Sequence, residues 1–217
     1  MHKSINNLIT IEDQIKSRFE DISKSKIIAV SKTFPIKEIE PLIDHGHVHF
    51  GENKVQEALD KWTDVKANFK NLKLHMIGKL QSNKVKFAIP LFDYIHSLDN
   101  LKLAEKISQE QIKNKKFLKI FIQVNIGNED QKNGINYNNL REFYNVCVSE
   151  LNLDIVGLMC IPPQGKNVDD YFKKMTDLNK SLNLKELSMG MSSDYLDAIK
   201  YGSTFVRIGS KIFGKRD

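Results

Sequence analysis

The chain has 217 residues, of which 41% are hydrophobic and 28% are charged, and its formal net charge at pH 7 is +6. This length fits one α/β domain with a full core, and no apolar run reaches the length of a membrane-spanning helix. The N-terminus lacks the apolar core of a signal peptide, and the two cysteines have no metal-ligand spacing, so we expect a cytoplasmic protein with reduced thiols.

Short apolar runs alternate with amphipathic stretches along the whole chain, without a low-complexity linker or an internal repeat. The candidate strands are residues 26–31, 47–50, 73–77, 93–97, 117–124, 154–159, 186–188 and 204–208. The candidate helices are residues 4–23, 35–45, 53–67, 82–89, 100–113, 137–150, 167–182 and 193–201. This alternation predicts a parallel sheet with helical crossovers.

Eight such strands predict an α/β fold, a single (β/α)8 barrel of the TIM type over residues 1–217, with the helix over 4–23 as an extra N-terminal element. A doubly wound open sheet is the main alternative, but its glycine-rich dinucleotide motif is absent after the first strand. Pro41 weakens the prediction of the second helix. Asp99 is expected to cap the helix that starts at residue 100.

Lys32 follows the apolar run of residues 27–30 within the tripeptide Ser31-Lys32-Thr33. In a barrel, functional side chains lie at the C-terminal strand ends, so Lys32 would lie at the barrel mouth with an apolar wall along its stem. Burial disfavours the ammonium form of a lysine, and a neutral amine can attack an aldehyde. Lys32 is therefore a candidate for a Schiff base to pyridoxal 5′-phosphate (PLP), although most strand-end lysines only extend their ammonium into water.

The segments after the last two predicted strands are rich in small residues. Ser192 and Ser193 stand at the start of the helix over 193–201, and Gly209-Ser210 is able to open another helical turn. Backbone N–H groups at helix starts bind phosphate, and the loops after strands 7 and 8 of a barrel often do so. These segments predict a phosphate site, with plain helix caps and turns as the alternative.

Arg207 lies within an otherwise apolar predicted strand. If alternation points it into the barrel, it must meet a partner, since a buried lone guanidinium is costly. One possible partner is a carboxylate in a structural ion pair. The other is the ring nitrogen of a bound heterocycle, which would stay unprotonated because arginine keeps its own proton.

Other polar residues at the strand ends carry weaker signals. Three histidines on different predicted strands lack the spacing of a zinc motif and are expected to be core or rim residues: His49, His75 and His96. The polar residues after the second strand also fit the start of a helix: Glu52, Asn53 and Glu57. Cys160 is expected to pack in the core, since the sequence offers no base to activate its thiol.

Together these segments resemble the pyridoxal-phosphate homeostasis proteins, a single-domain family similar to the N-terminal barrel of alanine racemase. The matching segments follow one another over nearly the whole chain: residues 29–33, 49–57, 75–84, 95–99, 123–125, 157–159, 187–192, 202–210 and 212–214. The Ser-Met-Gly-Met-Ser run over 188–192 and the Gly-Glu-Asn-x-Val-Gln-Glu run over 51–57 are together highly specific. Lys79 and Cys160 depart from residues that the family often has, and neither belongs to the implied PLP contacts.

The resemblance implies that Lys32 forms an aldimine with PLP. The further contacts that it implies are Asn53 at the ring, Arg207 at the pyridine nitrogen, and Ser192, Gly209 and Ser210 at the phosphate. Members of this family have no established catalytic activity. The resemblance therefore implies a monomeric protein that binds PLP and acts as a carrier or regulator in vitamin B6 and amino-acid homeostasis. Apo PLP-dependent enzymes are its candidate protein partners. We expect it to bind neither nucleic acid nor a membrane.

Two other functions remain alternatives at this point. A PLP-dependent racemase needs a second base opposite the lysine, which alanine racemase takes from a C-terminal domain of its partner subunit. We expect no such domain here, because the last predicted strand lies just before Asp217. A nucleic-acid-binding role would use the basic surface, but the lysines are scattered among acidic residues.

Overall fold

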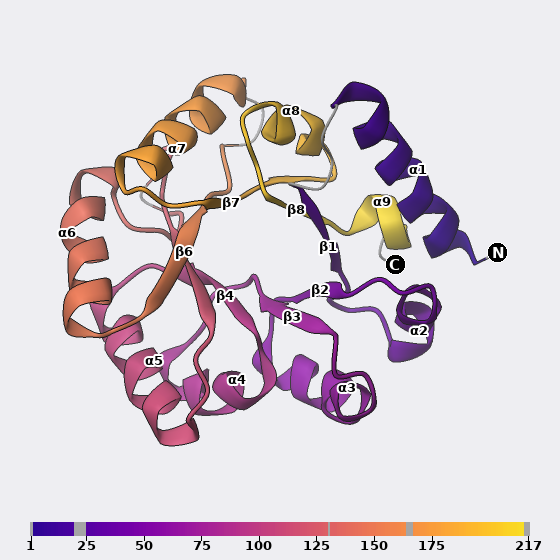
Figure 1. Cartoon of the computed structure of the whole chain (residues 1–217), viewed down its shortest axis with the longest axis horizontal. Helices are drawn as coiled ribbons and strands as arrows, with labels where there is room; N and C mark the ends of the chain where they lie inside the picture. Colours follow the sequence, from indigo (N-terminus) through magenta and orange to yellow (C-terminus); the bar gives the residue numbers. More distant parts are fainter. Residues whose placement is uncertain (1, 20–24, 130, 164–166, 215–217) are drawn as a thin grey trace.

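The computed structural model describes residues 2–19, 25–129, 131–163 and 167–214, which contain a closed barrel of parallel strands (Figure 1). The strands are β1 (Lys26–Val30), β2 (His49–Glu52), β3 (Lys73–Met76), β4 (Tyr94–Leu98), β5 (Lys119–Gln123), β6 (Asp154–Met159), β7 (Glu186–Met191) and β8 (Phe205–Ile208). Each strand pairs with the next, and β8 pairs with β1, so that no sheet edge is left open. The predicted TIM-type barrel is confirmed, and the open-sheet alternative is wrong.

A helix follows every strand and lies outside the barrel (Figure 1). The helices are α1 (Lys3–Arg18), α2 (Ile36–Asp44), α3 (Val55–Asn68), α4 (Val85–Leu91), α5 (Leu101–Asn114), α6 (Leu140–Asn145), α7 (Asp169–Ser181), α8 (Tyr195–Lys200) and α9 (Ser210–Phe213). The extra helix α1 buries Leu8, Ile11 and Ile15 along one face and lies beside α9. Among the described residues, no helix combines the length and apolar character needed to cross a membrane.

The helices predicted over 4–23 and 137–150 differ from the structure in extent or type. The helix predicted over 4–23 is α1, after which Phe19 is extended, and residues 20–23 lie outside the described residues. The helix predicted over 137–150 begins as a short 3-10 turn, continues as α6 and ends in a π-helical turn over Val146–Glu150.

One predicted helix cap needs correction, and the helix that contains Pro41 is confirmed. Asn100 rather than Asp99 caps α5, because the Asn100 side-chain oxygen accepts the Leu103 N–H at 3.0 Å. Pro41 does not interrupt α2, which continues through it. The residue after this proline, Leu42, is fully buried, and such packing stabilises a helix more than intrinsic propensity does.

Strand β7 is longer than the predicted 186–188, since it runs to Met191. Gly190 permits this path because its φ is +89°, and a Cβ there would lie 2.5 Å from the Cβ of Ala198 in α8. Because the strand is longer, the following helix begins later in the sequence, at Tyr195 rather than at the predicted residue 193.

Apolar side chains form an outer cluster between strands and helices and a smaller cluster inside the barrel. The inner cluster consists of Ile28, Phe121, Met159 and Phe205. Val206 and Ile208 of β8 belong to the outer cluster, whereas Phe205, the first residue of β8, belongs to the inner cluster. Because strand side chains alternate between the two faces, Arg207 also faces the barrel interior, as predicted.

Candidate functional site

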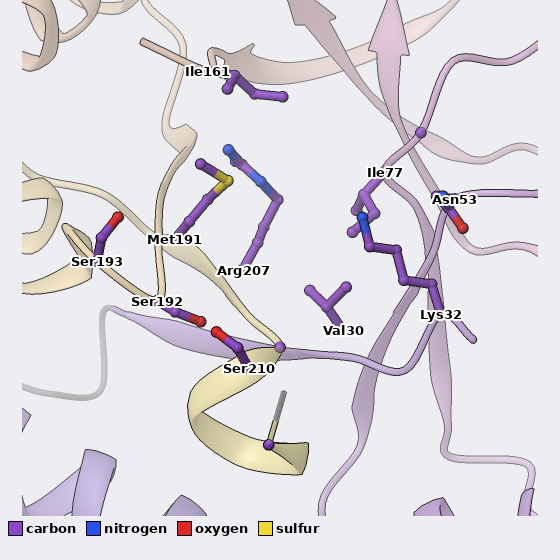
Figure 2. Close-up of a pocket in the computed structure, with 13 residues that line it drawn as sticks. Val30, Lys32, Asn53, Ile77, Ile161, Met191, Ser192, Ser193, Arg207 and Ser210 are labelled. Atoms are coloured by element: carbon purple, nitrogen blue, oxygen red, sulfur yellow. The ribbon is translucent and has the colours of Figure 1, made fainter. Parts of the chain in front are cut away.

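A cavity of about 790 Å³ opens where the C-terminal ends of the strands meet. All six residues predicted to bind a cofactor line it: Lys32, Asn53, Ser192, Arg207, Gly209 and Ser210. In the view of Figure 2, Lys32 and Asn53 lie on one side, the serines lie on the opposite side, and Arg207 rises between them. Residues that are far apart in the sequence therefore converge on one site.

The lining of this cavity fits an anionic group attached to a flat ring. Its charged side chains are Lys32 and Arg207, and none of the described lining residues is acidic. Its apolar walls are Val30, Ile77, Ile161 and Met191, and a third hydroxyl comes from Ser193. The Asn53 side-chain oxygen is buried and has no hydrogen-bond partner among the described residues, so it is available to a ligand. These residues fit PLP, with its phosphate and aromatic ring.

The apolar walls were not among the predicted cofactor contacts, whereas Ser193 belongs to the segment predicted to bind phosphate. Val30 and Met191 are each within two residues of a predicted contact, and this adjacency was the signal that could have identified them. Ile77 directly follows β3 and Ile161 lies two residues after the end of β6, and their assignment needed knowledge of which way each loop turns.

The loop that carries Lys32 is fixed by a buried cluster around Glu52, at the end of β2. Glu52 Oε1 accepts a hydrogen bond from Ser31 Oγ at 2.7 Å. It also accepts bonds from Lys61 Nζ and Trp62 Nε1 in α3, both at 2.9 Å. The Lys61 ammonium donates in addition to the Ser31 carbonyl oxygen at 2.9 Å. The residue before Lys32 is thus fixed through both its side chain and its backbone.

Glu57 holds the residue that follows Lys32. Glu57 Oε1 accepts the Thr33 N–H, and the Lys61 ammonium lies 3.1 Å from the same oxygen. Thr33 has a φ of +70°, so this bond stabilises a turn that a β-branched residue rarely adopts. Burial favours the neutral acid, but the Thr33 N–H and Lys61 outweigh it and hold the pKa of Glu57 below its usual range. The sequence-based interpretation of Glu57 as a helix-start residue was incomplete. Its i, i+4 spacing from Lys61 is typical of an ion pair and could have indicated this contact.

Arg207 is 5% exposed and has two neutral hydrogen-bond acceptors. Its Nη1 donates to Ser188 Oγ at 2.7 Å, and its Nη2 donates to the Cys160 carbonyl oxygen at 2.9 Å. Burial lowers the pKa of the guanidinium from its usual value, although Cys160 and Asp194 oppose this. The structural ion pair considered from the sequence does not occur within the described part of the chain. Arg207 therefore brings a positive charge to the cavity without a carboxylate at ion-pair distance among the described residues.

The position of Asn53 depends on a close backbone contact with Gly78, which lies just after β3. A Cβ at Gly78 would lie 2.4 Å from the Asn53 carbonyl oxygen and 2.7 Å from its Cα. Only glycine allows the two backbones to approach this closely. The contact fixes where the amide of Asn53 enters the cavity.

Two turns form the serine-rich side of the cavity. Ser192 and Ser193 lie between β7 and α8, so the prediction that they begin α8 is wrong, because β7 continues to Met191. Gly209 is the N-cap of α9, and Ser210 is its first residue, so the short helix predicted there is present. Hydroxyl groups and backbone N–H groups of such turns are donors for an anion.

The cysteine and histidine candidates have no catalytic setting. Cys147 and Cys160 are buried, and burial raises the pKa of each thiol to about 12, which keeps both in the poorly nucleophilic protonated form. The histidines His49, His75 and His96 bond to one another inside the barrel. Across the described residues, no group of three or more histidine, cysteine, aspartate and glutamate side chains is arranged to hold a metal ion.

Comparison with known proteins identifies close relatives of this chain. The family model described as alanine racemase, N-terminal domain, matches residues 7–217. The pyridoxal phosphate homeostasis protein of Aquifex aeolicus is 39% identical over 88% of this chain and 87% of its own length. The pyridoxal phosphate homeostasis protein of Escherichia coli K12 is 36% identical over 100% of this chain and 98% of its own length.

Solved structures show the same barrel. PipY of Synechococcus elongatus PCC7942, solved with PLP bound, is 33% identical with a TM-score of 0.86, over 97% of this chain and 100% of PipY. The alanine racemase of Clostridium difficile 630 is 17% identical with a TM-score of 0.72. That similarity covers 99% of this chain but 57% of the racemase, and at this identity it shows the fold alone.

Proposed function

The chain belongs to the pyridoxal phosphate homeostasis proteins within the alanine racemase N-terminal domain family, and we propose that it binds PLP and takes part in PLP and amino-acid homeostasis. The observation that carries this proposal is the convergence of the six predicted residues on one cavity whose charged lining residues are both cations. The PLP-bound structure of PipY, at 33% identity, supports it. In this proposal, residues 1–217 act as a single PLP-binding domain.

The neutral amine of Lys32 binds the aldehyde carbon of PLP through its Nζ as a Schiff base, and the aldehyde oxygen leaves with the two amine protons as water. Three observations support this role. Lys32 lines the cavity two residues after the end of β1, the apolar side chain of Ile77 lines the same cavity, and hydrogen bonds from neighbouring elements fix Ser31 and Thr33 on both sides of Lys32. A fixed loop reduces the entropy that the lysine would lose on binding.

The other residues that line the cavity contact the phosphate and the ring of PLP. Ser192, Gly209 and Ser210 bind the phosphate through hydroxyl and backbone N–H groups. Asn53 contacts the ring through the buried side-chain oxygen that has no partner within the described chain. Arg207 faces the ring nitrogen, because its guanidinium rises from β8 between the lysine side and the serine side (Figure 2).

We assign this protein a carrier or regulatory role without strong catalytic activity. When bound, PLP supplies an electron-withdrawing ring. Arg207 keeps its own proton and leaves the ring nitrogen unprotonated, which weakens the ring as an electron sink. Apart from Lys32, the described lining residues include no general acid or base suited to neutral pH, so no second base faces the lysine. An amino-acid racemase or lyase is the alternative, favoured by the lysine and by the fold shared with alanine racemase.

Transfer of PLP to an apo-enzyme tests this role. The protein is loaded with PLP, separated from free PLP by gel filtration, and mixed with an apo PLP-dependent enzyme. We expect the wild type to elute as a monomer with PLP and to restore enzyme activity, and Lys32→Ala to restore none. Lys79→Ala, which removes an exposed lysine outside the cavity, is the matched control and should behave as the wild type. A wild type that retains no PLP would contradict the proposal.

A further inference from the structure

A row of hydrogen-bonded side chains runs through the barrel interior and ends on Arg207. His49 Nδ1 lies 3.0 Å from His75 Nε2, and His75 Nδ1 lies 2.9 Å from His96 Nε2. His96 Nδ1 lies 2.8 Å from Ser188 Oγ, which accepts the Nη1–H of Arg207 at 2.7 Å. The two central histidines and the serine are fully buried, with an exposure of 0% each.

The three imidazoles are neutral at neutral pH. Burial lowers the pKa of His75 and of His96 well below 6.5, and for His96 the charge of Arg207 adds to the effect. Burial also lowers the pKa of His49 to about 4. Each ring therefore carries one N–H and one acceptor nitrogen.

Neutral rings joined in this way have only two fully bonded arrangements. If His75 carries its proton on Nε2, it donates to His49 Nδ1 and accepts from His96 Nε2–H, so all three rings are Nε2–H tautomers. If His75 carries its proton on Nδ1, the same reasoning makes all three rings Nδ1–H tautomers. Any mixture places two donors or two acceptors opposite each other.

Ser188 distinguishes the two arrangements. With Nε2–H tautomers, the Ser188 hydroxyl donates to His96 Nδ1 and accepts from Arg207, so every group in this contact is satisfied. With Nδ1–H tautomers, His96 and Arg207 both donate to Ser188 Oγ, and the hydroxyl hydrogen has no other acceptor among the described residues. A buried donor without an acceptor is unfavourable.

The charges at the two ends of the row favour opposite arrangements, and the buried charge has the larger effect. Arg207 is a buried cation, and the Nε2–H arrangement turns the negative end of each imidazole dipole toward it. Lys26 and Lys73 lie near His49 at the other end and favour the reverse arrangement. Lys73 is exposed and the Lys26 side chain is 40% exposed, so water screens both of them more than it screens Arg207.

We infer that His49, His75 and His96 are all Nε2–H tautomers and that, through Ser188, they stabilise the buried charge of Arg207 in place of a carboxylate. The row makes these four residues positioning residues for Arg207. Their effect on PLP rests on the proposed function, in which Arg207 faces the ring nitrogen. The row itself belongs to the protein without ligand and is testable there.

The tautomers are measured directly by two-bond ¹H–¹⁵N NMR on the ligand-free wild type labelled with ¹⁵N-histidine. The chain has six histidines, and His75→Gln and His96→Gln spectra assign the buried signals by their disappearance. We expect neutral Nε2–H patterns for the three residues of the row. Nδ1–H tautomers or charged imidazolium rings at neutral pH would overturn the inference.

A pair of serine variants tests the link to Arg207. Ser188→Ala removes the connecting hydroxyl, whereas Ser97→Ala removes a buried hydroxyl that has no hydrogen-bond partner within the described chain. We expect Ser188→Ala to weaken PLP binding about tenfold or more, because the variant loses a hydrogen bond to a charged group. We also expect the visible absorption band of bound PLP to shift. Ser97→Ala should match the wild type in both measurements.

The outcomes separate this inference from the proposed function. If the wild type and Ser188→Ala bind PLP alike and with the same band, PLP binding stands and the role of the row is wrong. If the wild type binds no PLP, the proposed function fails, and the tautomer measurement still decides whether the row is arranged as inferred.

Discussion

The ammonium of Lys61 lies 2.9 Å from the carbonyl oxygen of Ser31, the residue before Lys32. The same ammonium lies 2.9 Å from Glu52, and the two side chains are 8% and 0% exposed. One buried ion pair therefore joins α3 to the ends of β1 and β2 and fixes the loop that carries the proposed PLP lysine.

Removal of the cation from this pair should destabilise the fold strongly. In Lys61→Met, Glu52 would keep a buried charge without its partner, and we expect the free energy of unfolding to fall by about 3–5 kcal/mol. Urea denaturation measures this loss. Lys106→Met is the matched control, because Lys106 is 37% exposed in its pair with Glu110, and we expect a loss of about 0–1 kcal/mol. Similar losses in the two variants would show that the buried pair has no special role.

Gly78→Ala should damage the cavity through the backbone. The added Cβ would lie 2.4 Å from the Asn53 carbonyl oxygen, so Asn53 must move, and we expect a lower melting temperature and weaker PLP binding. Gly209→Ala is the control for stability, because its Cβ would have its nearest contact at an ordinary 3.4 Å from Val30. A Gly78→Ala protein with wild-type melting and PLP affinity would mean that this close approach does not position Asn53.

The barrel and the residues of its cavity could be predicted because their signals are local. Lys32 lies two residues after an apolar run, and alternation along β8 is enough to point Arg207 inward. The small residues after the last two strands mark the serine-rich turns. The start of α8 was misplaced, because the positive φ of Gly190 extends β7 in a way that composition does not reveal.

Contacts between distant elements could not be predicted in the same way. The histidine row depends on the register of neighbouring parallel strands, which aligns Gly51 with His75 and Met76 with Ile95. Nothing in a single sequence specifies that register to one residue, and a shift of one would turn the histidines to the other face. The cluster around Glu52 likewise needs the packing angle of α3 against β2.

Stability should fall as the pH falls below 6.5. Burial lowers the pKa of His75 and His96 well below 6.5 in the folded protein, whereas both titrate near 6.5 in the unfolded chain. The unfolded state then binds protons that the folded state does not, so each histidine lowers the free energy of unfolding by about 1.4 kcal/mol per pH unit. Urea denaturation between about pH 5 and pH 8, above the range of most carboxylates, measures this slope. A free energy of unfolding that is constant below pH 6.5 would contradict the neutral, buried state of these rings.

The carrier role predicts no efficient racemisation. The PLP-loaded protein is incubated with L-alanine in deuterated water, and the α-proton is followed by NMR. We expect the signal to persist without formation of the D-isomer, since no second base in the described lining faces Lys32. An alanine racemase under the same conditions is the positive control. Rapid exchange with accumulation of D-alanine would favour the enzyme alternative.

The most direct test of the account is borohydride reduction of the PLP-loaded protein, followed by peptide mass spectrometry. The account predicts that the visible absorption band disappears on reduction and that the reduced PLP adduct is found on Lys32. Lys32→Ala should lack both the band and the adduct, while Lys79→Ala should retain them. An adduct only on other lysines, or a Lys32→Ala protein with an unchanged visible spectrum, would contradict the account.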